Sequence, residues 1–380
     1  MVDKLSSIGH VLFNRSGCFL LSDQNTLDTV NIAIDAMGGD FGPKVIIPAL
    51  EMVLDGRPEV SFLIYGDEVE IKKHLKKHPK LTDHVKIFHT DKMVKNDDKP
   101  SAALRASKGS GMRMAIEAVK SGEADAVVSA GNTGALMAMA KIVLKTIPGI
   151  HRPAIASVMP GLNGDTIMLD LGANVLVDAD TLVQFAVLGS VFARANKTRN
   201  DDGVQNDIRP TVGLLNIGTE DTKGPEHVRA AGEILSRIDF PGEYKGFVEG
   251  NDITKGDVDV IVSDGYAGNI ALKTMEGVGH LVRTYLKESF RSNTLSKIGA
   301  FFAYFALKNL RKRMDPRRYN GGVFLGLNGV CIKSHGGADA LGFSSAVILA
   351  ARLSRKGYIA QISHDISSLT DQEDFLSQNN

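Results

Sequence analysis

Residues 32–43 read Ile-Ala-Ile-Asp-Ala-Met-Gly-Gly-Asp-Phe-Gly-Pro, an apolar strand followed by an acidic, glycine-rich turn and a helix-compatible stretch. Glycines at 38, 39 and 42 permit positive φ and let the backbone approach a ligand closely. The helix that follows would direct its positive end at an anion. The turn therefore predicts either an anion site, with Gly38, Gly39 and Asp40 against substrate, or only a tight connection.

Five further apolar, β-branched runs end in polar or small residues ahead of helix-compatible segments: 60–65, 126–129, 167–171, 212–217 and 258–262. Strands that are apolar on both faces and alternate with helices predict a largely parallel sheet covered on both sides. We therefore expect an α/β fold with three α/β/α layers and a largely parallel mixed sheet. At 380 residues the chain suits one large unit or two lobes that share a sheet.

Polar, glycine-rich turns follow four of these runs, at 130–134, 172–174, 218–224 and 263–269. Ligands of such sheets bind beyond the carboxyl ends of the strands, so we expect these turns and the opening turn at one sheet edge, around one pocket. Amides, hydroxyls, backbone N–H groups and lysines there suit phosphate and a developing oxyanion. The substrate-binding residues predicted in addition to those of the opening turn are Ser129, Gly131, Asn132, Thr133, Asp170, Asn174, Asn216, Asp264, Gly265, Lys273 and His335.

Five strings occur in order: Ile-Asp-Ala-Met-Gly-Gly-Asp from 34, Ser-Ala-Gly-Asn-Thr-Gly-Ala from 129, Asp-Leu-Gly-Ala-Asn from 170, Ser-Asp-Gly-Tyr-Ala-Gly-Asn from 263 and Ser-His-Gly-Gly-Ala-Asp from 334. Over 31–361 the chain resembles the bacterial phosphate acyltransferase family, departing from it at Leu171 and in the segment before 31. The resemblance implies acyl transfer from acyl carrier protein to inorganic phosphate, giving acyl phosphate for phospholipid synthesis.

The same resemblance implies an isopropylmalate-dehydrogenase-like α/β/α fold, a homodimer, and neither metal nor cofactor. It also implies peripheral association with the inner face of the cell membrane, where a downstream glycerol-3-phosphate acyltransferase would be a further partner. Three other functions are weighed beside it: a phosphotransacylase that uses acyl-coenzyme A, a dehydrogenase of the same fold, and a non-catalytic membrane scaffold that binds the carrier protein.

Phosphate is ionised near neutral pH and can itself attack a thioester, so positioning and hydrogen-bond donors should dominate catalysis. Lys223, in a loop that opens a helix, is predicted to pair with phosphate, and Asn269 is predicted to donate to the thioester oxygen. The alternatives are a solvated loop charge for Lys223, a helix cap for Asn269 and a capping or packing role for His335. Arg105 and Lys108 would add positive potential at the mouth.

Residues 287–318 hold nine basic and two acidic residues, an excess of seven positive charges in a chain with 44 of each sign. Apolar side chains among them predict a basic, amphipathic helical hairpin, 287–320, inserted in the catalytic domain, for an anionic membrane surface or an acidic carrier protein. A core helix with a basic end or a dimer contact is the alternative. The predicted contact residues are Ile298, Phe301, Phe302, Phe305, Lys308, Arg311 and Arg313.

Balanced charge argues against wholesale nucleic-acid binding. Two cysteines, Cys18 and Cys331, are too few for a disulfide scaffold and suit a reducing cytoplasm. We expect no signal peptide and no membrane span. We expect a flexible extension over 1–30, a polar surface loop over 196–209 and a poorly ordered tail over 362–380.

Overall fold

The computed structural model describes residues 29–197, 209–313, 315–354 and 357–378. The extension predicted before residue 31 and the loop predicted at 196–209 therefore lie almost wholly outside the described residues. Within these ranges the strands are β1 (Val30–Asp35), β2 (Val60–Gly66), β3 (Val85–His89), β4 (Ala126–Ser129), β5 (Ala154–Met159), β6 (Thr166–Leu169), β7 (Thr211–Leu215), β8 (Glu243–Val248), β9 (Val260–Val262), β10 (Gly322–Leu325) and β11 (Val330–Lys333).

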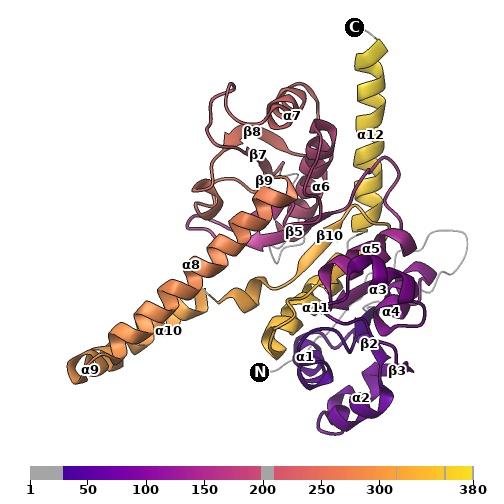
Figure 1. The fold of residues 1–380 in the computed structure, drawn as a ribbon, viewed down its shortest axis with the longest axis vertical. Coiled ribbons are helices and arrows are strands. Elements are labelled where there is room, and N and C mark those ends of the chain that lie inside the picture. The colour runs from indigo at the N-terminus through magenta and orange to yellow at the C-terminus, as the bar shows by residue number, and fades with distance from the viewer. Residues whose placement is uncertain (1–28, 198–208, 314, 355–356, 379–380) are drawn as a thin grey trace, which may run out of the picture.

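Helices cover both faces of the single sheet that these strands form (Figure 1). They are α1 (Pro43–Gly56), α2 (Glu68–Leu75), α3 (Pro100–Ala106), α4 (Gly111–Ser121), α5 (Thr133–Val143), α6 (Ala179–Lys197), α7 (Glu226–Arg237), α8 (Gly265–Arg291), α9 (Thr294–Phe302), α10 (Tyr304–Arg313), α11 (Ala340–Ser354) and α12 (Tyr358–Gln378). Apolar side chains of α1, α6, α7, α11 and α12 share one buried cluster, and those of α3, α4, α5 and α8 pack with another. The predicted three-layer α/β/α fold with a largely parallel mixed sheet is confirmed.

The strand order is β3-β2-β1-β4-β11-β10-β5-β6-β9-β7-β8. Strands β3, β2, β1, β4 and β11 are mutually parallel, and so are β6, β9, β7 and β8. Strand β10 is antiparallel to both of its neighbours, and β5 is antiparallel to β6. The two parallel groups therefore run in opposite directions.

This reversal corrects the expectation that five polar turns lie at one sheet edge. The turns after β1 and β4 lie at one edge, with the end of β11, whereas those after β6, β9 and β7 lie at the other. The cause is the connection between β5 and β6, residues 160–165, which is too short for a parallel crossover and makes an antiparallel hairpin.

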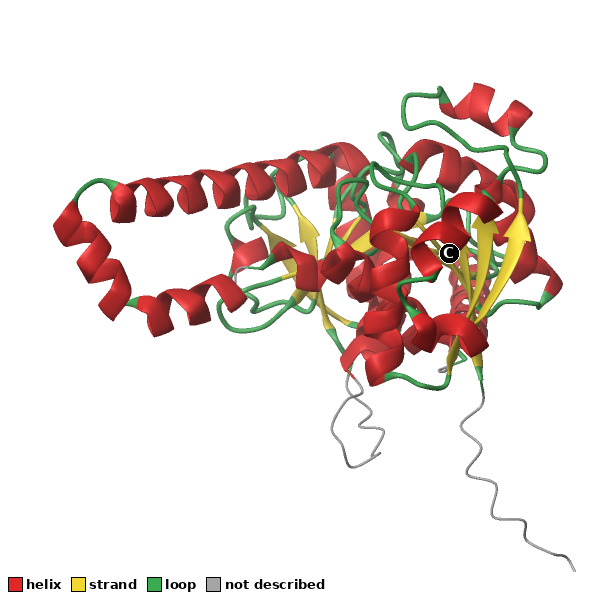
Figure 2. Cartoon of the chain, turned by 90° about the horizontal axis from the view of Figure 1, so that it is seen from below, coloured by secondary structure: helices red, strands yellow, loops and turns green. Residues whose placement is uncertain are grey.

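Helix α8 leaves the body of the molecule as a long arm, and α9 and α10 return beside it (Figures 1 and 2). The segment predicted as a hairpin, 287–320, thus forms the outer end of α8, then α9, α10 and a short 3-10 turn, Pro316–Tyr319. The arm itself begins earlier, because α8 is one continuous helix from Gly265.

The segment predicted as a poorly ordered tail, 362–380, lies mostly in α12. Residues up to Gln378 belong to α12, whose first half packs on α6. Ile362 and Ile366 are buried there, one helical turn apart, in the same cluster as Phe192 of α6. Apolar spacing of four residues was the signal for a helix at this end.

The first turn of α8 packs tightly against the end of β6. A Cβ at Gly268 would lie 2.0 Å from the carbonyl oxygen of Asp170 and 2.6 Å from Ser263 Oγ, whereas one at Gly277 on the same helix meets open space. We expect Gly268→Ala to lower the free energy of unfolding by about 2 kcal/mol or more through overpacking.

The matched change Gly277→Ala should be neutral or stabilise by up to about 1 kcal/mol, since alanine favours a helix interior. Urea denaturation of both variants checks this. Equal effects of the two substitutions would contradict the close packing of α8 on β6.

Candidate active site

Three polar residues end neighbouring parallel strands in register. Asp35 of β1 pairs with Ser129 of β4, and Ser129 pairs with Lys333 of β11. The residues one position earlier in each strand belong to the core on the α1 and α11 side. Because side chains alternate along a strand, Asp35, Ser129 and Lys333 all face the α4, α5 and α8 layer.

Asp35 is the buried centre of this group, with 3% of its surface exposed. It accepts a hydrogen bond from Ser129 Oγ at 2.6 Å and further bonds from the backbone N–H groups of Met37 and Gly38. Burial nevertheless raises the pKa of Asp35 to about 6, against the lowering effects of these bonds and of Lys333. Its carboxylate thus organises the opening turn from inside.

The turns at this edge use several of their own backbone donors. Ser129 Oγ accepts from Gly131 N at 3.0 Å, and Asp40 N donates to the carbonyl of Gly336 at 2.9 Å. A Cβ at Gly38 would lie 2.7 Å from both Asp35 Oδ2 and Gly131 N. The N–H groups of Gly38, Gly131 and Asp40, predicted as part of an anion site, are therefore bonded within the protein, and the glycines allow the turns to interlock.

Asn132 and Asp40 tie the same edge to the preceding loop. Asn132 Oδ1 caps α5 by accepting from Ala135 N at 2.9 Å, and its amide donates to the carbonyls of Asn96 and Asp98. Asn96 Nδ2 in turn donates to Asp40 Oδ1 at 3.0 Å. Predicted residues that remain exposed here are Thr133 at the start of α5, and Arg105 and Lys108 around the end of α3.

Lys333 brings positive charge to this edge. Lys333 Nζ donates to the carbonyl of Ala130 at 3.2 Å and to that of Ser334. Burial lowers the pKa of Lys333 to about 8; Asp35 and Asp40 oppose the shift and Lys273 adds to it. Lys273 itself lies on α8, a helix that begins at the opposite edge of the sheet.

His335 has a local role. Its Nδ1 accepts from Gly337 N at 3.1 Å, and its own N–H donates to Asn320 Oδ1 at 3.0 Å. The imidazole is exposed. This arrangement matches the capping alternative for His335, and the ring remains exposed beside the turns.

At the opposite edge, Asp170 holds the turn after β6. Its carboxylate accepts from the backbone N–H groups of Ile155, Ala173 and Asn174 and from the Asn174 amide, at 2.7–3.0 Å. Burial raises the pKa of Asp170, with these hydrogen bonds opposing the shift. Asn174 also donates to the carbonyl of Pro153. Asp170 and Asn174, both predicted to bind substrate, thus hold the backbone of this turn in place.

Asn269 lies at the same edge on the first turns of α8 and is exposed. It does not cap that helix: the cap is Asp264, which accepts from Ala267 N at 2.7 Å, while Gly265 N donates to the Asn174 carbonyl. The backbone of Gly172, at φ +123, approaches the Asn269 side chain, since a Cβ there would lie 3.5 Å from Asn269 Cγ. The amide is therefore available to a ligand beside this turn.

Lys223 lies farther along this edge, in the loop after β7, two strands from β6. Its side chain is 53% exposed, and Nζ lies 3.9 Å from Glu220. Asn216 shapes the loop by donating to the Lys223 carbonyl at 3.0 Å and accepting from Ile217 N. The Lys223 side chain thus projects from a loop whose backbone is held by hydrogen bonds of Asn216.

Helix α8 carries the predicted residues Asn269 and Lys273. It starts against the turn after β6, and Asn269 and Lys273 are four residues apart, on one helix face. The candidate site is therefore the region along the first turns of α8, beside the Gly172 turn. Asp35 and Lys333 were not among the predicted residues, although each directly ends an apolar run.

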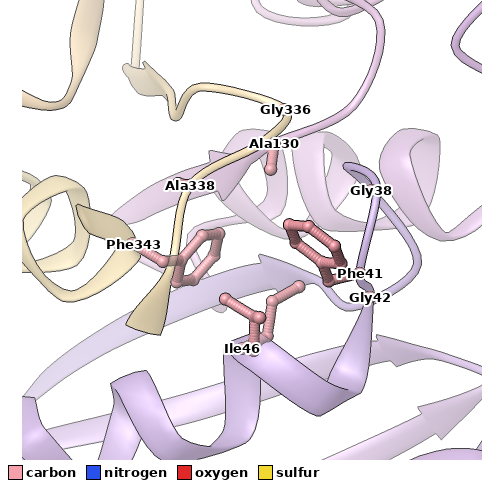
Figure 3. Close-up of a pocket in the computed structure, with 9 residues that line it drawn as sticks. Gly38, Phe41, Gly42, Ile46, Ala130, Gly336, Ala338 and Phe343 are labelled. Carbon is pink, nitrogen blue, oxygen red and sulfur yellow. The ribbon is translucent and has the colours of Figure 1, made fainter. Parts of the chain in front are cut away.

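A small apolar pocket lies on the other side of the interlocked turns (Figure 3). The rings of Phe41 and Phe343 flank it and Ile46 forms part of its floor, with Gly38, Ala130 and Gly336 from the turns above. Its volume of about 10 Å³ holds at most one water. The pocket belongs to the packing of the turns on α1 and α11.

Solved structures define the class to which this architecture belongs. The chain superposes on a phosphotransacetylase from Streptococcus pyogenes with a TM-score of 0.55, at 19% identity, covering 86% of this chain and 94% of that one. EutD phosphotransacetylase from Staphylococcus aureus gives 0.54 at 16% identity, covering 86% and 94%. The fold is that of the phosphotransacetylases.

The sequence relatives are closer. The chain is 50% identical over 342 residues to a phosphate acyltransferase from Parvibaculum lavamentivorans, covering 90% of this chain and 92% of that protein. It is 51% identical over 338 residues to one from Rhodospirillum centenum, covering 89% and 93%. The family described as "Fatty acid synthesis protein" matches residues 30–361. The chain belongs to this family of phosphate acyltransferases and is an acyltransferase enzyme.

The buried carboxyl of Asp35 predicts a pH dependence of stability. Its pKa is about 6 in the folded chain and 3.8 ordinarily, so between these values the folded state binds more protons than the unfolded state. Stability from this group is therefore present at low pH and declines as pH rises from about 4 to 6, by about 3 kcal/mol at most.

Asp35→Asn lacks this titration. We expect the melting temperature of the wild type, relative to that of Asp35→Asn, to fall between pH 4 and 6 and to level off above about pH 6.5. Lys333 stays protonated through this window because its pKa is about 8. A difference that is constant across the window would contradict the raised pKa.

Proposed function

We propose that this acyltransferase moves a fatty acyl group from acyl carrier protein to inorganic phosphate, releasing acyl phosphate and free carrier for phospholipid synthesis. The proposal rests above all on the identity of about half to phosphate acyltransferases over nearly the whole chain. The donor-bearing first turns of α8, beside the turn that Asp170 holds, support it.

The reaction needs no nucleophile from the protein. An oxygen of phosphate attacks the thioester carbonyl, the C–O bond forms, and the C–S bond breaks as the carrier thiolate leaves. The proton that phosphate gives up neutralises the thiolate. The protein must hold a dianion against a carbonyl and stabilise the tetrahedral oxyanion, which rigid donors achieve without reorganisation.

Asn269 suits the oxyanion. It is exposed beside the Gly172 backbone, and Asp264, which caps α8, and the turn held by Asp170 fix the helix that carries it. A neutral amide donates a hydrogen bond without adding charge. Lys223 is proposed to attract phosphate from the neighbouring loop, since its 3.9 Å contact with Glu220 is a weak surface pair.

Asn269→Ala should lower kcat by about a hundredfold or more, the usual effect of removing one oxyanion donor, and Lys223→Ala should do the same if that ammonium stabilises the transition state. Steady-state kinetics with acyl carrier protein thioester and phosphate measure this. Asn251→Ala, in an exposed loop, is the matched control and should retain normal turnover. Near-normal turnover in a folded Asn269→Ala or Lys223→Ala variant removes that residue from the proposal.

An assay that traps acyl phosphate with hydroxylamine tests the reaction itself. Product should depend on phosphate and form from the carrier protein thioester. Product from acyl-coenzyme A alone would replace the proposed donor. Absence of any phosphate-dependent product from either donor would reject the proposed function.

The arm is proposed to bind an anionic membrane surface at the inner face of the cell membrane. Phe301, Phe302 and Phe305 on α9 and α10 are 76–80% exposed, and Ile298 is 50% exposed. Lys308 is exposed beside them; Arg311 and Arg313 lie on α10, but their side chains are outside the described part. Among the described residues no helix is long and apolar enough to cross a membrane. Exposed aromatics flanked by cations suit the interface.

A homodimer is also part of the proposal. Apolar side chains that recur at three- and four-residue spacing along the exposed length of α8 support it: Val278, Leu281, Val282, Tyr285 and Leu286. Such a stripe is typical of helix pairing.

Phe302→Asp should release the protein from anionic vesicles, because it places a negative charge at the exposed tip of the arm, while turnover with soluble substrates stays within about twofold. Vesicle co-sedimentation measures binding. Val69→Asp is the control, since Val69 is 77% exposed on α2, away from the arm. Undiminished vesicle binding by Phe302→Asp and Phe305→Asp would exclude the arm as the membrane contact.

A further inference from the structure

Residues 90–110, which include α3, form a platform beside the turns that follow β1 and β4. Asn96 Nδ2 donates to Asp40 Oδ1 at 3.0 Å. The Asn132 amide donates to the carbonyls of Asn96 and Asp98 at 2.8 and 3.0 Å. The platform is therefore fixed both to the opening turn and to the start of α5.

The inner side of the platform belongs to the core. Val94 and Ala103 are buried in the same apolar cluster against which Leu272 of α8 packs. Thr90 Oγ1 donates to the carbonyl of Gly109 at 2.6 Å and joins the two ends of the segment. The platform and the first turns of α8 thus share one face of the sheet, whereas the tip of the arm lies away from α3 (Figure 1).

The outer side of the platform carries cations without acidic partners. Lys92, Lys95, Lys99, Arg105 and Lys108 are all exposed. Within the described residues, no ion pair joins any of these five side chains to a carboxylate. The segment also holds three acidic residues, which leaves an excess of two positive charges. Its ammonium and guanidinium groups are therefore available to an anionic partner.

An apolar side chain lies among these cations. Met93 is 52% exposed, between Lys92 and Lys95 in the chain. An apolar centre with a polar rim is the usual anatomy of a protein–protein interface, and methionine is enriched there. The arm differs, because it exposes three phenylalanines with its cations, a composition that suits a lipid interface. The platform therefore favours a protein with an acidic surface over a membrane.

We propose that the platform is the docking surface for the acidic carrier protein that delivers the acyl thioester. The proposal rests on the proposed function, which supplies this partner. Complementary charge would steer the carrier to the platform, and a surface that is already rigid loses little freedom on binding. The carrier's flexible prosthetic group then presents the thioester to the candidate site on the same face of the sheet. The tip of the arm stays free for a membrane.

Reversal of two of these charges, Lys95→Glu with Lys99→Glu, tests the surface. We expect KM for the carrier thioester to rise about tenfold or more while kcat stays within about twofold, because opposed charges weaken docking. KM for phosphate and for an acyl-pantetheine donor, which has no protein to dock, should not change. The matched control is Lys76→Glu with Lys77→Glu, which changes the charge equally on exposed residues where α2 ends.

The salt dependence distinguishes docking from a structural effect. The difference in KM between the wild type and the Lys95→Glu, Lys99→Glu pair should shrink at high salt, because exposed charges are screened. An unchanged KM for the carrier thioester overturns the surface, and so does an equal rise in the Lys76→Glu, Lys77→Glu control. Weaker co-sedimentation with anionic vesicles, at an unchanged carrier KM, would assign the platform to the membrane instead.

Direct binding separates this proposal from the proposed function. If the wild type forms no phosphate-dependent product, its binding to fluorescently labelled acyl carrier protein is measured by anisotropy. Binding that Lys95→Glu with Lys99→Glu weakens about tenfold, and that Lys76→Glu with Lys77→Glu retains, supports the surface independently of acyl transfer. No binding by the wild type, or equal binding by all three proteins, overturns it.

Discussion

The packing of the first turn of α8 against the end of β6 is the contact on which the site depends. Glycine at 268 lets the helix approach to a distance at which a Cβ would be 2.0 Å from the Asp170 carbonyl. From that starting point one continuous helix carries Asn269 and Lys273 and extends into the arm. A single helix therefore links the turn after β6 to the arm.

Buried carboxylates give both edges of the sheet their rigidity. Asp35 and Asp170 each accept several hydrogen bonds from the backbone of a neighbouring turn, and burial raises the pKa of both. Backbone donors that satisfy these carboxylates are not free to bind substrate. The glycine-rich turns therefore shape the candidate site, and the side chains of Lys223, Asn269 and Lys273 remain exposed.

Sequence patterns predicted the layers well, because buried strands and amphipathic helices are local features. The runs at 60–65, 126–129, 167–171, 212–217 and 258–262 all overlap observed strands. They did not predict strand direction, since the residues 154–159 were not recognised as a strand and the hairpin at 160–165 was missed. Asp35 and Lys333 were overlooked because each is one charged residue at the end of an apolar run.

The sequence by itself determined the α/β class, the family and the order of the polar turns, because strings of residues and their hydrophobic pattern do not depend on how strands pair. Only the tertiary structure decided which turns share an edge, that the N–H groups of Gly38 and Gly131 are bonded internally, and that the Asp170 turn packs against the start of α8. The physical reason is that each of these depends on contacts between segments far apart in the chain. Strand direction, register and the path of α8 set those contacts.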